Sequence, residues 1–303
     1  MPNAPSARQT QSFLMRRFAE SGIRPRTPLG QNFLIDLNLL DLLLETAQIG
    51  PDDVVLEVGT GTGSLTALMA TLAAAVVTVE VDHRLFQLAS EELINFDNVV
   101  MLQTDALKNK NRLTPAVLDA VAAQLDAAPS RRFKLVANLP YNVATPILSN
   151  LLALDRPPVS MTATIQKELA ERIAAAPGCK DYGALSVWMQ SQCRVEIVRV
   201  LPPSAFWPRP KVSSAFIQIA IDEALRGRIP DRAFFHEFVR AMFFHRRKFV
   251  RSELLSAVKN RLDKPAVDRL LAAQEIEPTV RAEELGVEKF LALCEAVRAE
   301  GTP

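Results

Sequence analysis

Short apolar runs that each end in a polar or glycine-rich turn alternate with amphipathic segments through residues 37–221. Continuous β-branched apolar runs are typical of buried strands in a parallel sheet, and apolar residues recurring at helical spacing predict helices. We therefore expect an α/β fold with a seven-stranded, mostly parallel sheet. The expected strands are 53–59, 76–80, 99–103, 133–137, 161–166, 194–201 and 213–221, and the expected helices are 11–21, 37–47, 64–72, 112–128, 144–154, 167–176 and 182–192.

The pattern changes after Asp222, and from Asp231 onward only helical periodicity remains. Helices are expected at 232–245, 248–260, 265–274 and 283–299. The apolar side chains that recur at core spacing in the first of these are Phe234, Phe235, Phe238, Met242 and Phe243. We expect three parts: an N-terminal extension with a helix (1–29), the sheet domain (30–224) and a smaller all-α C-terminal domain (225–303).

A length of 303 residues with 49% hydrophobic side chains is enough for two domains with full cores. The net charge of +1 does not indicate a polyanionic partner, but the basic residues are clustered. For any one cluster a solvated face is the commoner explanation, whereas three clusters beside a candidate base pocket indicate nucleic acid. The clusters are Arg8, Arg16, Arg17, Arg24 and Arg26; Arg199, Arg209 and Lys211; and Arg240, Arg246, Arg247, Lys248 and Arg251.

The three cysteines, Cys179, Cys193 and Cys294, are scattered, which indicates neither a disulfide framework nor a metal site and fits a reducing compartment. No apolar run reaches the ~18 residues of a membrane span. Residues 1–10 lack the apolar core of an export signal. We expect a cytoplasmic protein that binds no metal and no membrane. An Arg- and Ser-bearing organelle transit segment stays open as the alternative.

The first strand runs into Gly59-Thr-Gly61-Thr-Gly63 and then a helix. This spacing departs from G-x-G-x-x-G and is that of a loop that admits an adenosine without a pyrophosphate. Glu80 ends the second strand about 20 residues later, where an acid in nucleotide-binding sites accepts hydrogen bonds from ribose hydroxyls. Asp105 follows the third strand and is a candidate partner for an adenine amino group, with a helix N-cap as the alternative.

The fourth strand ends in Asn138-Leu139-Pro140-Tyr141. The Asn138 side-chain oxygen and the Leu139 carbonyl, whose direction Pro140 restricts, can accept two hydrogens from an exocyclic amino group. Tyr141 offers a face for stacking, so the motif predicts a nucleobase pocket, with an ordinary proline turn as the alternative.

Two loops predict further contacts. The segment 30–34 places the amides Gln31 and Asn32 beside two apolar residues ahead of a helix, where it could close over a cofactor or simply pack as a lead-in. The proline-stiffened segment 202–211 carries Phe206 and Trp207 beside Arg209 and Lys211. Such a loop suits stacking on a flipped base, although aromatic residues packed inward would explain it as well.

Taken together, these segments resemble the ribosomal RNA adenine dimethyltransferase family. The matching motifs span roughly residues 24–290: Gly30-Gln-Asn-Phe-Leu-x-Asp36, Glu57-x-Gly-x-Gly-x-Gly63, Asn138-Leu-Pro-Tyr141, Gln166-Lys-Glu168 through Glu171-Arg172, Pro177-Gly178, Tyr182-Gly183, Pro203-x-x-Phe206-x-Pro208-x-Pro210-Lys211-Val-x-Ser214 and Arg246-Arg-Lys248.

The resemblance implies a Rossmann-like fold and S-adenosylmethionine as methyl donor. It also implies dimethylation of the N6 amino groups of two adjacent adenosines near the 3′ end of small-subunit (16S) ribosomal RNA, during small-subunit biogenesis. The implied partner is the small ribosomal subunit, and we expect a monomer. The implied site residues are Gln31, Asn32, Leu34, Gly59, Gly61, Gly63, Glu80, Asp105, Ala106 and Asn138 for the cofactor; Asn138, Leu139, Pro140 and Tyr141 for catalysis; Tyr141 and Phe206 for stacking on the base; and Arg209, Lys211, Arg246, Arg247 and Lys248 for RNA.

Two departures from the family pattern concern the loop and the helical domain. Thr60 stands where the family usually has proline, which should loosen the turn slightly, and Phe249 stands where it more often has threonine. Three other functions fit the sequence less well. The proline loop and Asn138-Leu-Pro argue against a large-subunit RNA methyltransferase that confers antibiotic resistance, and the intact glycines argue against a non-catalytic nucleic-acid-binding factor. A small-molecule methyltransferase would not need the basic helical domain.

Overall fold

The computed structural model describes residues 11–25, 30–245, 247–259 and 261–300. The chain forms two compact units. Unit 1 comprises Met1–Ala170 and Glu196–Ala220, and unit 2 comprises Glu171–Val195 and Ile221–Pro303. Unit 2 therefore contains the segment 171–195 in addition to the C-terminal helices. The assignment of residues 225–303 to RNA binding stays a prediction.

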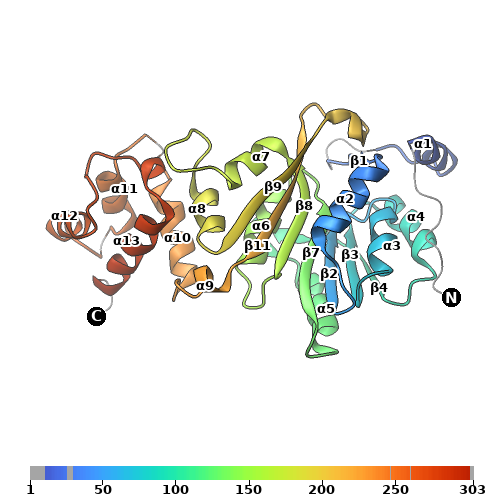
Figure 1. Cartoon of the computed structure of the whole chain (residues 1–303), viewed down its shortest axis with the longest axis horizontal. Helices are drawn as coiled ribbons and strands as arrows, with labels where there is room; N and C mark the ends of the chain where they lie inside the picture. The colour runs from blue at the N-terminus through green and yellow to red at the C-terminus, as the bar shows by residue number, and fades with distance from the viewer. Residues whose placement is uncertain (1–10, 26–29, 246, 260, 301–303) are drawn as a thin grey trace. The chain divides into compact units, whose positions relative to one another are not determined.

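The seven-stranded, mostly parallel sheet is confirmed (Figure 1). In spatial order its strands are β4 (Val99–Gln103), β3 (Ala75–Glu80), β2 (Asp53–Val58), β7 (Arg132–Asn138), β8 (Ser160–Gln166), β11 (Ser214–Ile221) and β9 (Cys193–Leu201). The pairs β4–β3, β3–β2, β2–β7 and β7–β8 are parallel, and β11 runs antiparallel to β8. Every residue of β2 and β3 is buried, as expected for strands covered on both faces.

Helices α2 and α3 pack on one face of this sheet, where their apolar side chains share a core cluster with Val55, Val76 and Val136. Asp36 and Asp82 cap α2 and α4 by accepting hydrogen bonds from the first backbone N–H groups of each helix. The helices that begin in unit 1 are α1 (Gln11–Glu20), α2 (Leu37–Ala47), α3 (Ser64–Ala70), α4 (His83–Leu93), α5 (Pro115–Asp126), α6 (Ala144–Leu152) and α7 (Lys167–Ile173).

The helix expected from residue 112 begins later than predicted. Arg112–Leu113 forms strand β6, which pairs with β5 (Leu107–Asn109), and α5 starts at Pro115. Proline is favoured in the first turn of a helix because its missing N–H would have no partner there. A two-residue strand has no period of its own, so the periodicity of α5 was extended too far.

A second short pairing joins the two loops predicted to contact ligands. Strand β1 (Phe33–Leu34) pairs antiparallel with β10 (Phe206–Trp207), which follows a short 3-10 turn at Pro203–Ala205. Phe33 and Trp207 pack around Phe18 of α1, with ring centroids 5.2 and 5.4 Å from the Phe18 ring. The proline loop is thereby fixed to the segment ahead of α2.

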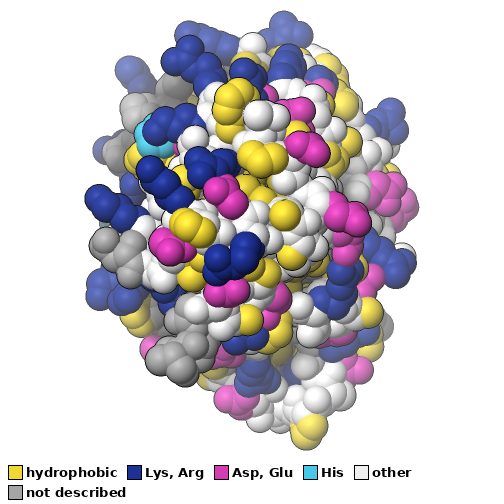
Figure 2. Space-filling model, turned by 90° about the vertical axis from the view of Figure 1, so that its left-hand side faces the viewer, with side chains coloured by type: hydrophobic (Ala, Val, Ile, Leu, Met, Phe, Trp, Pro, Cys, Tyr) yellow, Lys and Arg dark blue, Asp and Glu magenta, His cyan; other side chains and the backbone are white. Residues whose placement is uncertain are grey.

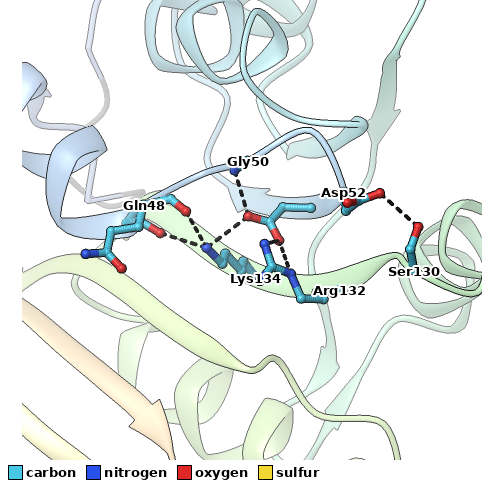
Figure 3. A network of polar contacts seen from close by, with 8 residues as sticks. Gln48, Gly50, Asp52, Ser130, Arg132 and Lys134 are labelled. Carbon is cyan, nitrogen blue, oxygen red and sulfur yellow. Dashed lines mark hydrogen bonds and ion pairs between the residues drawn. The ribbon is translucent and has the colours of Figure 1, made fainter.

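A buried ion pair ties β2, β7 and the end of α2 together (Figure 3). Lys134 Nζ lies 2.9 Å from Asp53 Oδ2 and donates to the backbone carbonyls of Ala47 and Gln48. Asp53 is fully buried and also accepts from the Arg132 guanidinium. Because both charges have partners within hydrogen-bond distance, their burial at the start of these strands is compensated.

Three of the five side chains that the periodicity predicted for the core of unit 2 are buried, while Phe234 and Phe243 are half-buried. Phe235, Phe238 and Met242 of α10 are buried, and Phe243 stacks on Phe290 of α13. Its helices are α8 (Ala184–Gln190), α9 (Glu223–Arg226), α10 (Arg232–Met242), α11 (Val250–Ala257), α12 (Lys264–Ala273) and α13 (Val287–Glu300), with a 3-10 turn at Ala282–Glu284. None of the helices in the described ranges is both long and apolar enough to span a membrane.

Candidate active site

A cleft in unit 1 opens where strands β2, β3, β4 and β7 end. In open α/β sheets, ligands bind at this edge. The residues predicted for the cofactor that line this cleft are Gln31, Asn32, Gly59, Gly61, Glu80, Asp105, Ala106 and Asn138. The strand topology therefore brings together residues that are up to 107 positions apart in the sequence, from Gln31 to Asn138.

The glycine loop forms the floor of the cleft. Gly59 and Gly61 have φ angles of +90° and +58°, in the region that favours glycine. A Cβ on Gly61 would lie 3.2 Å from the Phe33 ring, and one on Gly59 would lie 3.4 Å from Pro140. The backbone conformation thus favours glycine at both positions, and at Gly61 the close approach of Phe33 favours it as well. Gly63 has a φ of +80° and lies outside the lining of the cleft, directly ahead of α3.

Glu80 closes the far side of the loop. Its Oε2 accepts from the Gly61 N–H at 2.9 Å and its Oε1 from the Asp82 N–H at 2.9 Å. The side chain is buried, which raises the pKa of its carboxyl group. A solvated acid at the end of a strand is therefore excluded: Glu80 is oriented by the loop and faces the cleft. Each carboxylate oxygen keeps a further lone pair for a hydroxyl donor.

Asp105 lies on the rim of the cleft after β4. Its Oδ1 accepts from the Leu107 N–H at 2.9 Å, and its backbone carbonyl accepts from the Thr114 hydroxyl at 2.7 Å. Strand β5 starts at Leu107, two residues after Asp105, and no helix begins there, so the N-cap explanation for Asp105 is wrong. The side chain is exposed and faces the cleft, where its other oxygen can accept from a ligand.

A chain of hydroxyl groups runs beneath the glycine loop to the buried carboxyl group of Glu57. Glu57 Oε2 accepts from Thr66 Oγ1 at 2.5 Å and from Thr78 Oγ1 at 2.7 Å. Because the Thr78 hydrogen points to Glu57, the Thr60 hydroxyl donates to Thr78 Oγ1 at 2.7 Å. Burial raises the pKa of Glu57 to about 8. The carboxyl group is therefore neutral at pH 7, and the sequence assigned it no role.

The tip of β7 holds Asn138 with its amide group oriented. Asn138 Nδ2 donates to the backbone carbonyl of Asn32 at 2.7 Å, which leaves the side-chain oxygen as an acceptor toward the cleft. The Leu139 N–H donates to Thr164 O at 3.1 Å and fixes the peptide beside it. Tyr141 OH lies 2.6 Å from Ser214 Oγ. Burial raises the pKa of the Tyr141 hydroxyl, so it stays a neutral donor and acceptor.

Several predicted residues lie outside the cleft lining. Leu34 lines a smaller neighbouring cavity together with Glu57 and Thr60. Phe206 is 2% exposed and packs in the core cluster with α2, and Trp207 packs against Phe33, so in this structure both aromatic residues of the proline loop face inward. The stacking role of Phe206 stays a prediction.

The residues predicted to bind RNA are exposed where the structure describes them. Arg209 and Lys211 lie on the proline loop of unit 1, and Arg247 and Lys248 lie between α10 and α11 of unit 2. Arg246 lies outside the described residues. The roles of all five in RNA binding stay predictions.

The sequence did not single out part of the cleft lining. These residues are Val58, Val79, Val81, Leu85, Thr104, Asn142 and Val143. Most are apolar neighbours of the predicted polar residues, and their pattern is that of ordinary core positions. Asn142, directly after the Asn138-Leu-Pro-Tyr motif, is the one whose amide could have been noticed. Within the residues that the structure describes, no group of three or more His, Cys, Asp or Glu side chains is arranged to hold a metal ion.

Comparison with known proteins gives one consistent family. A family model described as ribosomal RNA adenine dimethylase matches residues 22–297. A protein of Lactiplantibacillus plantarum named ribosomal RNA small subunit methyltransferase A is 40% identical over 279 residues, which cover 91% of this chain and 91% of that protein. A protein of the same name from Moorella thermoacetica is 37% identical over 275 residues, covering 90% and 93%.

Two solved structures share the fold over most of their length. A dimethyladenosine transferase from Plasmodium falciparum superposes with a TM-score of 0.73 and 23% identity, covering 88% of this chain and 97% of that one. The 23S rRNA methyltransferase ErmE superposes with a TM-score of 0.60 and 24% identity, covering 88% and 100%. At these identities the superpositions establish the architecture of the fold.

Proposed function

This chain belongs to the ribosomal RNA adenine dimethylase family, and from that premise we propose that it dimethylates two adjacent adenosines near the 3′ end of small-subunit (16S) ribosomal RNA. The methylated atoms are the N6 amino nitrogens. The curated relatives named above, which align over about nine tenths of both chains, support the small subunit as the substrate. The single structural observation that carries the proposal is Asn138 at the tip of β7, oriented by Asn32.

The cleft fits S-adenosylmethionine, which supplies an electrophilic methyl group when bound. Gly59 and Gly61 line the cleft beside Glu80 without side chains, so a nucleoside could approach their backbone. Glu80, already held by two backbone N–H groups, would accept hydrogens from ribose hydroxyls. Asp105 would accept from the adenine amino group of the cofactor, and Gln31 and Asn32 would cover it from the segment ahead of α2.

Asn138 and Leu139 would act on the amino group of the target adenine. Its lone pair is delocalised into the ring, so the nitrogen is a weak nucleophile. The Asn138 side-chain oxygen and the Leu139 carbonyl would accept its two hydrogens and turn the lone pair out of the ring plane. Hydrogen bonds to Asn32 and Thr164 already hold Asn138 and Leu139, so the two acceptors would need little reorganisation during the reaction. Most of the rate enhancement would therefore come from alignment and electrostatics.

Tyr141 would hold the target base between planes. Its hydroxyl is fixed by Ser214 of β11, which orients the ring at the end of β7. Phe206 would stack on the opposite face after moving out of the core cluster in which it now packs. Arg209, Lys211, Arg246, Arg247 and Lys248 would neutralise RNA phosphates.

We also propose that the protein acts as a monomer in the cytoplasm. Cys193 and Cys294 are buried free thiols, and burial raises the pKa of each to about 12, which keeps them unreactive in a reducing compartment.

Replacing Asn138 with alanine tests the proposal. The variant should lose about 10²- to 10³-fold in kcat, since it lacks one oriented acceptor at the reacting nitrogen. Methyl transfer is measured with tritiated cofactor and small subunits that lack the dimethyl marks, and cofactor binding by calorimetry should weaken by less than about tenfold. Asn111→Ala, in the exposed turn between β5 and β6, is the matched control. Unchanged turnover of Asn138→Ala, with wild-type cofactor binding, would refute the catalytic role.

A further inference from the structure

Two phenylalanines of unit 2 lie on the surface beside basic residues. Phe244 is 78% exposed and Phe249 is 48% exposed, which is unusual for large apolar side chains. Phe243, directly before Phe244, stacks instead on Phe290 in the core with 5.4 Å between ring centroids. The helical period of α10 ends at Met242, so Phe244 does not belong to the apolar stripe of that helix.

The segment that carries these rings is held at both ends. The Lys248 N–H donates to His245 O at 2.9 Å, which closes a turn. His245 Nδ1 lies 3.2 Å from Oε1 of Glu253, a carboxylate that is 1% exposed. On the other side, Phe249 bridges to Arg281, and the Val250 N–H donates to Val280 O. These contacts hold the chain at His245 and at Phe249, next to the two rings, which lowers the entropy that a bound partner would have to remove.

The charge around the two rings is positive. Arg247 and Lys248 are exposed between them. Arg281, opposite Phe249, is paired with Glu283 at 3.9 Å, so Arg247 and Lys248 carry the positive charge of this surface. The nearest acid along the chain, Glu253, is buried against His245. Figure 2 shows that Lys and Arg side chains gather in the upper left of the face turned to the viewer, with fewer Asp and Glu side chains among them.

Exposed aromatic rings that alternate with cations match the chemistry of single-stranded nucleic acid. Bases stack on aromatic faces while the basic side chains meet the phosphates, and RNA is recognised mostly through such unpaired bases. An anionic membrane would also meet cations and apolar groups, but it would require a larger apolar face than two separate rings. The proposed ribosomal RNA substrate supplies unpaired bases, so this inference rests on the proposed function.

We propose that Phe244 and Phe249, with Arg247 and Lys248 between them, form a stacking surface for unpaired bases of the ribosomal RNA substrate. The surface lies on unit 2 and is separate from the cleft of unit 1 in which the target adenosine would react. It adds base stacking to the phosphate contacts expected from the basic residues.

The test compares three variants of Phe244 in binding to two probes: an RNA hairpin with an adenine-rich single-stranded loop, and small subunits that lack the dimethyl marks. Phe244→Ala should bind both probes about tenfold more weakly, Phe244→Leu should bind as weakly as the alanine variant, and Phe244→Tyr should bind as wild type does. Ile94→Ala is the matched control, because Ile94 is 77% exposed at the end of α4 in unit 1. Its affinity for both probes should be unchanged.

Salt dependence separates stacking from charge. The slope of log Kd against log salt should be unchanged in Phe244→Ala and should fall by about one in Lys248→Ala. Because Phe244 is largely exposed, its alanine variant should melt at the wild-type temperature.

The following results of these binding measurements would overturn the proposed stacking surface. If Phe244→Ala or Phe244→Leu bound the hairpin as wild type does, the ring would not stack on RNA. A loss of affinity for the small subunit with unchanged hairpin binding would assign Phe244 to a protein contact. Both cases leave the proposed methylation intact as long as wild type methylates small subunits. If wild type neither bound RNA nor methylated the subunit, both proposals would fail together.

Discussion

Replacing Glu57 with glutamine is expected to remove a pH dependence from the stability of unit 1. Glu57 is 1% exposed beneath the glycine loop and accepts hydrogen bonds from the Thr66 and Thr78 hydroxyls. Its charged neighbour is another acid, Glu80. Neutral hydroxyl donors offset only part of the desolvation, so burial raises the pKa of Glu57 from 4.5 to about 8.

The sign of the effect follows from which state keeps the proton. Between pH 4.5 and about pH 8 the folded protein holds the Glu57 proton while the unfolded chain has lost it. The folded state then binds more protons, so this contribution to stability is complete below pH 4.5 and is lost as the pH rises toward 8. At about 1.4 kcal/mol for each pH unit, the loss from pH 5 to pH 7 is on the order of 2 kcal/mol.

Urea unfolding at several pH values between about 5 and 7 measures this loss. Trp207 reports on unit 1 in a Trp188→Phe background, since the chain has two tryptophans and Trp188 lies in unit 2. Over this range the unfolding free energy of Glu57→Gln should rise relative to the parent protein by about 2 kcal/mol. Glu45→Gln, at an exposed position of α2, controls for the loss of one carboxylate. A difference between Glu57→Gln and the parent that did not vary with pH would refute the reasoning.

Two further predictions concern the buried ion pair of Lys134 and Asp53 and the hydrogen bond between Ser214 and Tyr141. Lys134→Met removes the ammonium group beside fully buried Asp53 and should lower the unfolding free energy of unit 1 by about 3 kcal/mol in the Trp207 assay. Adding Asp53→Asn to this variant should recover part of the loss. A double variant no more stable than Lys134→Met would show that the two charges are not coupled. Ser214→Ala breaks the bond to the Tyr141 hydroxyl and should lower kcat about tenfold with a smaller change in KM, while Ser214→Thr keeps a hydroxyl and should retain most of the rate. Wild-type kcat in Ser214→Ala would mean that this bond does not position the ring.

Polar residues at strand ends could be predicted from the sequence because the carboxyl ends of parallel strands lie at the edge of the sheet where ligands bind. A buried strand is recognised by its apolar run, and its carboxyl end then lies at the ligand edge whatever the remaining packing is. Glu80 and Asn138 were found in this way, although they come from separate βα units. The rule says nothing about which apolar neighbours complete the wall, so Val79 and Val143 were missed.

Contacts between distant segments without a period of their own could not be predicted. Strands β1 and β10 are two residues each, and their pairing depends on where α1 and the proline loop meet. The same limit explains why the segment 171–195 belongs to unit 2. Tyr182 donates its hydroxyl hydrogen to Leu285 O across 103 positions, and Trp188 stacks on His236 with ring centroids 4.4 Å apart. Local pattern describes α8 correctly but does not reveal these partners.

Thr60 shows how a departure from a family pattern is compensated by its surroundings. Proline at this position would restrict the turn through its ring, and from the sequence alone its replacement by threonine was expected to loosen the turn. The structure instead gives Thr60 two hydrogen bonds that proline could not make: its N–H donates to Val79 O at 3.2 Å, and its hydroxyl donates to Thr78 at 2.7 Å. The second bond joins the loop to Glu57 through Thr78. Because Glu57 holds its proton at pH 7, the hydrogen bonds from Thr60 through Thr78 end on a neutral carboxyl group. Hydrogen bonds therefore restrain the turn in place of the ring of a proline.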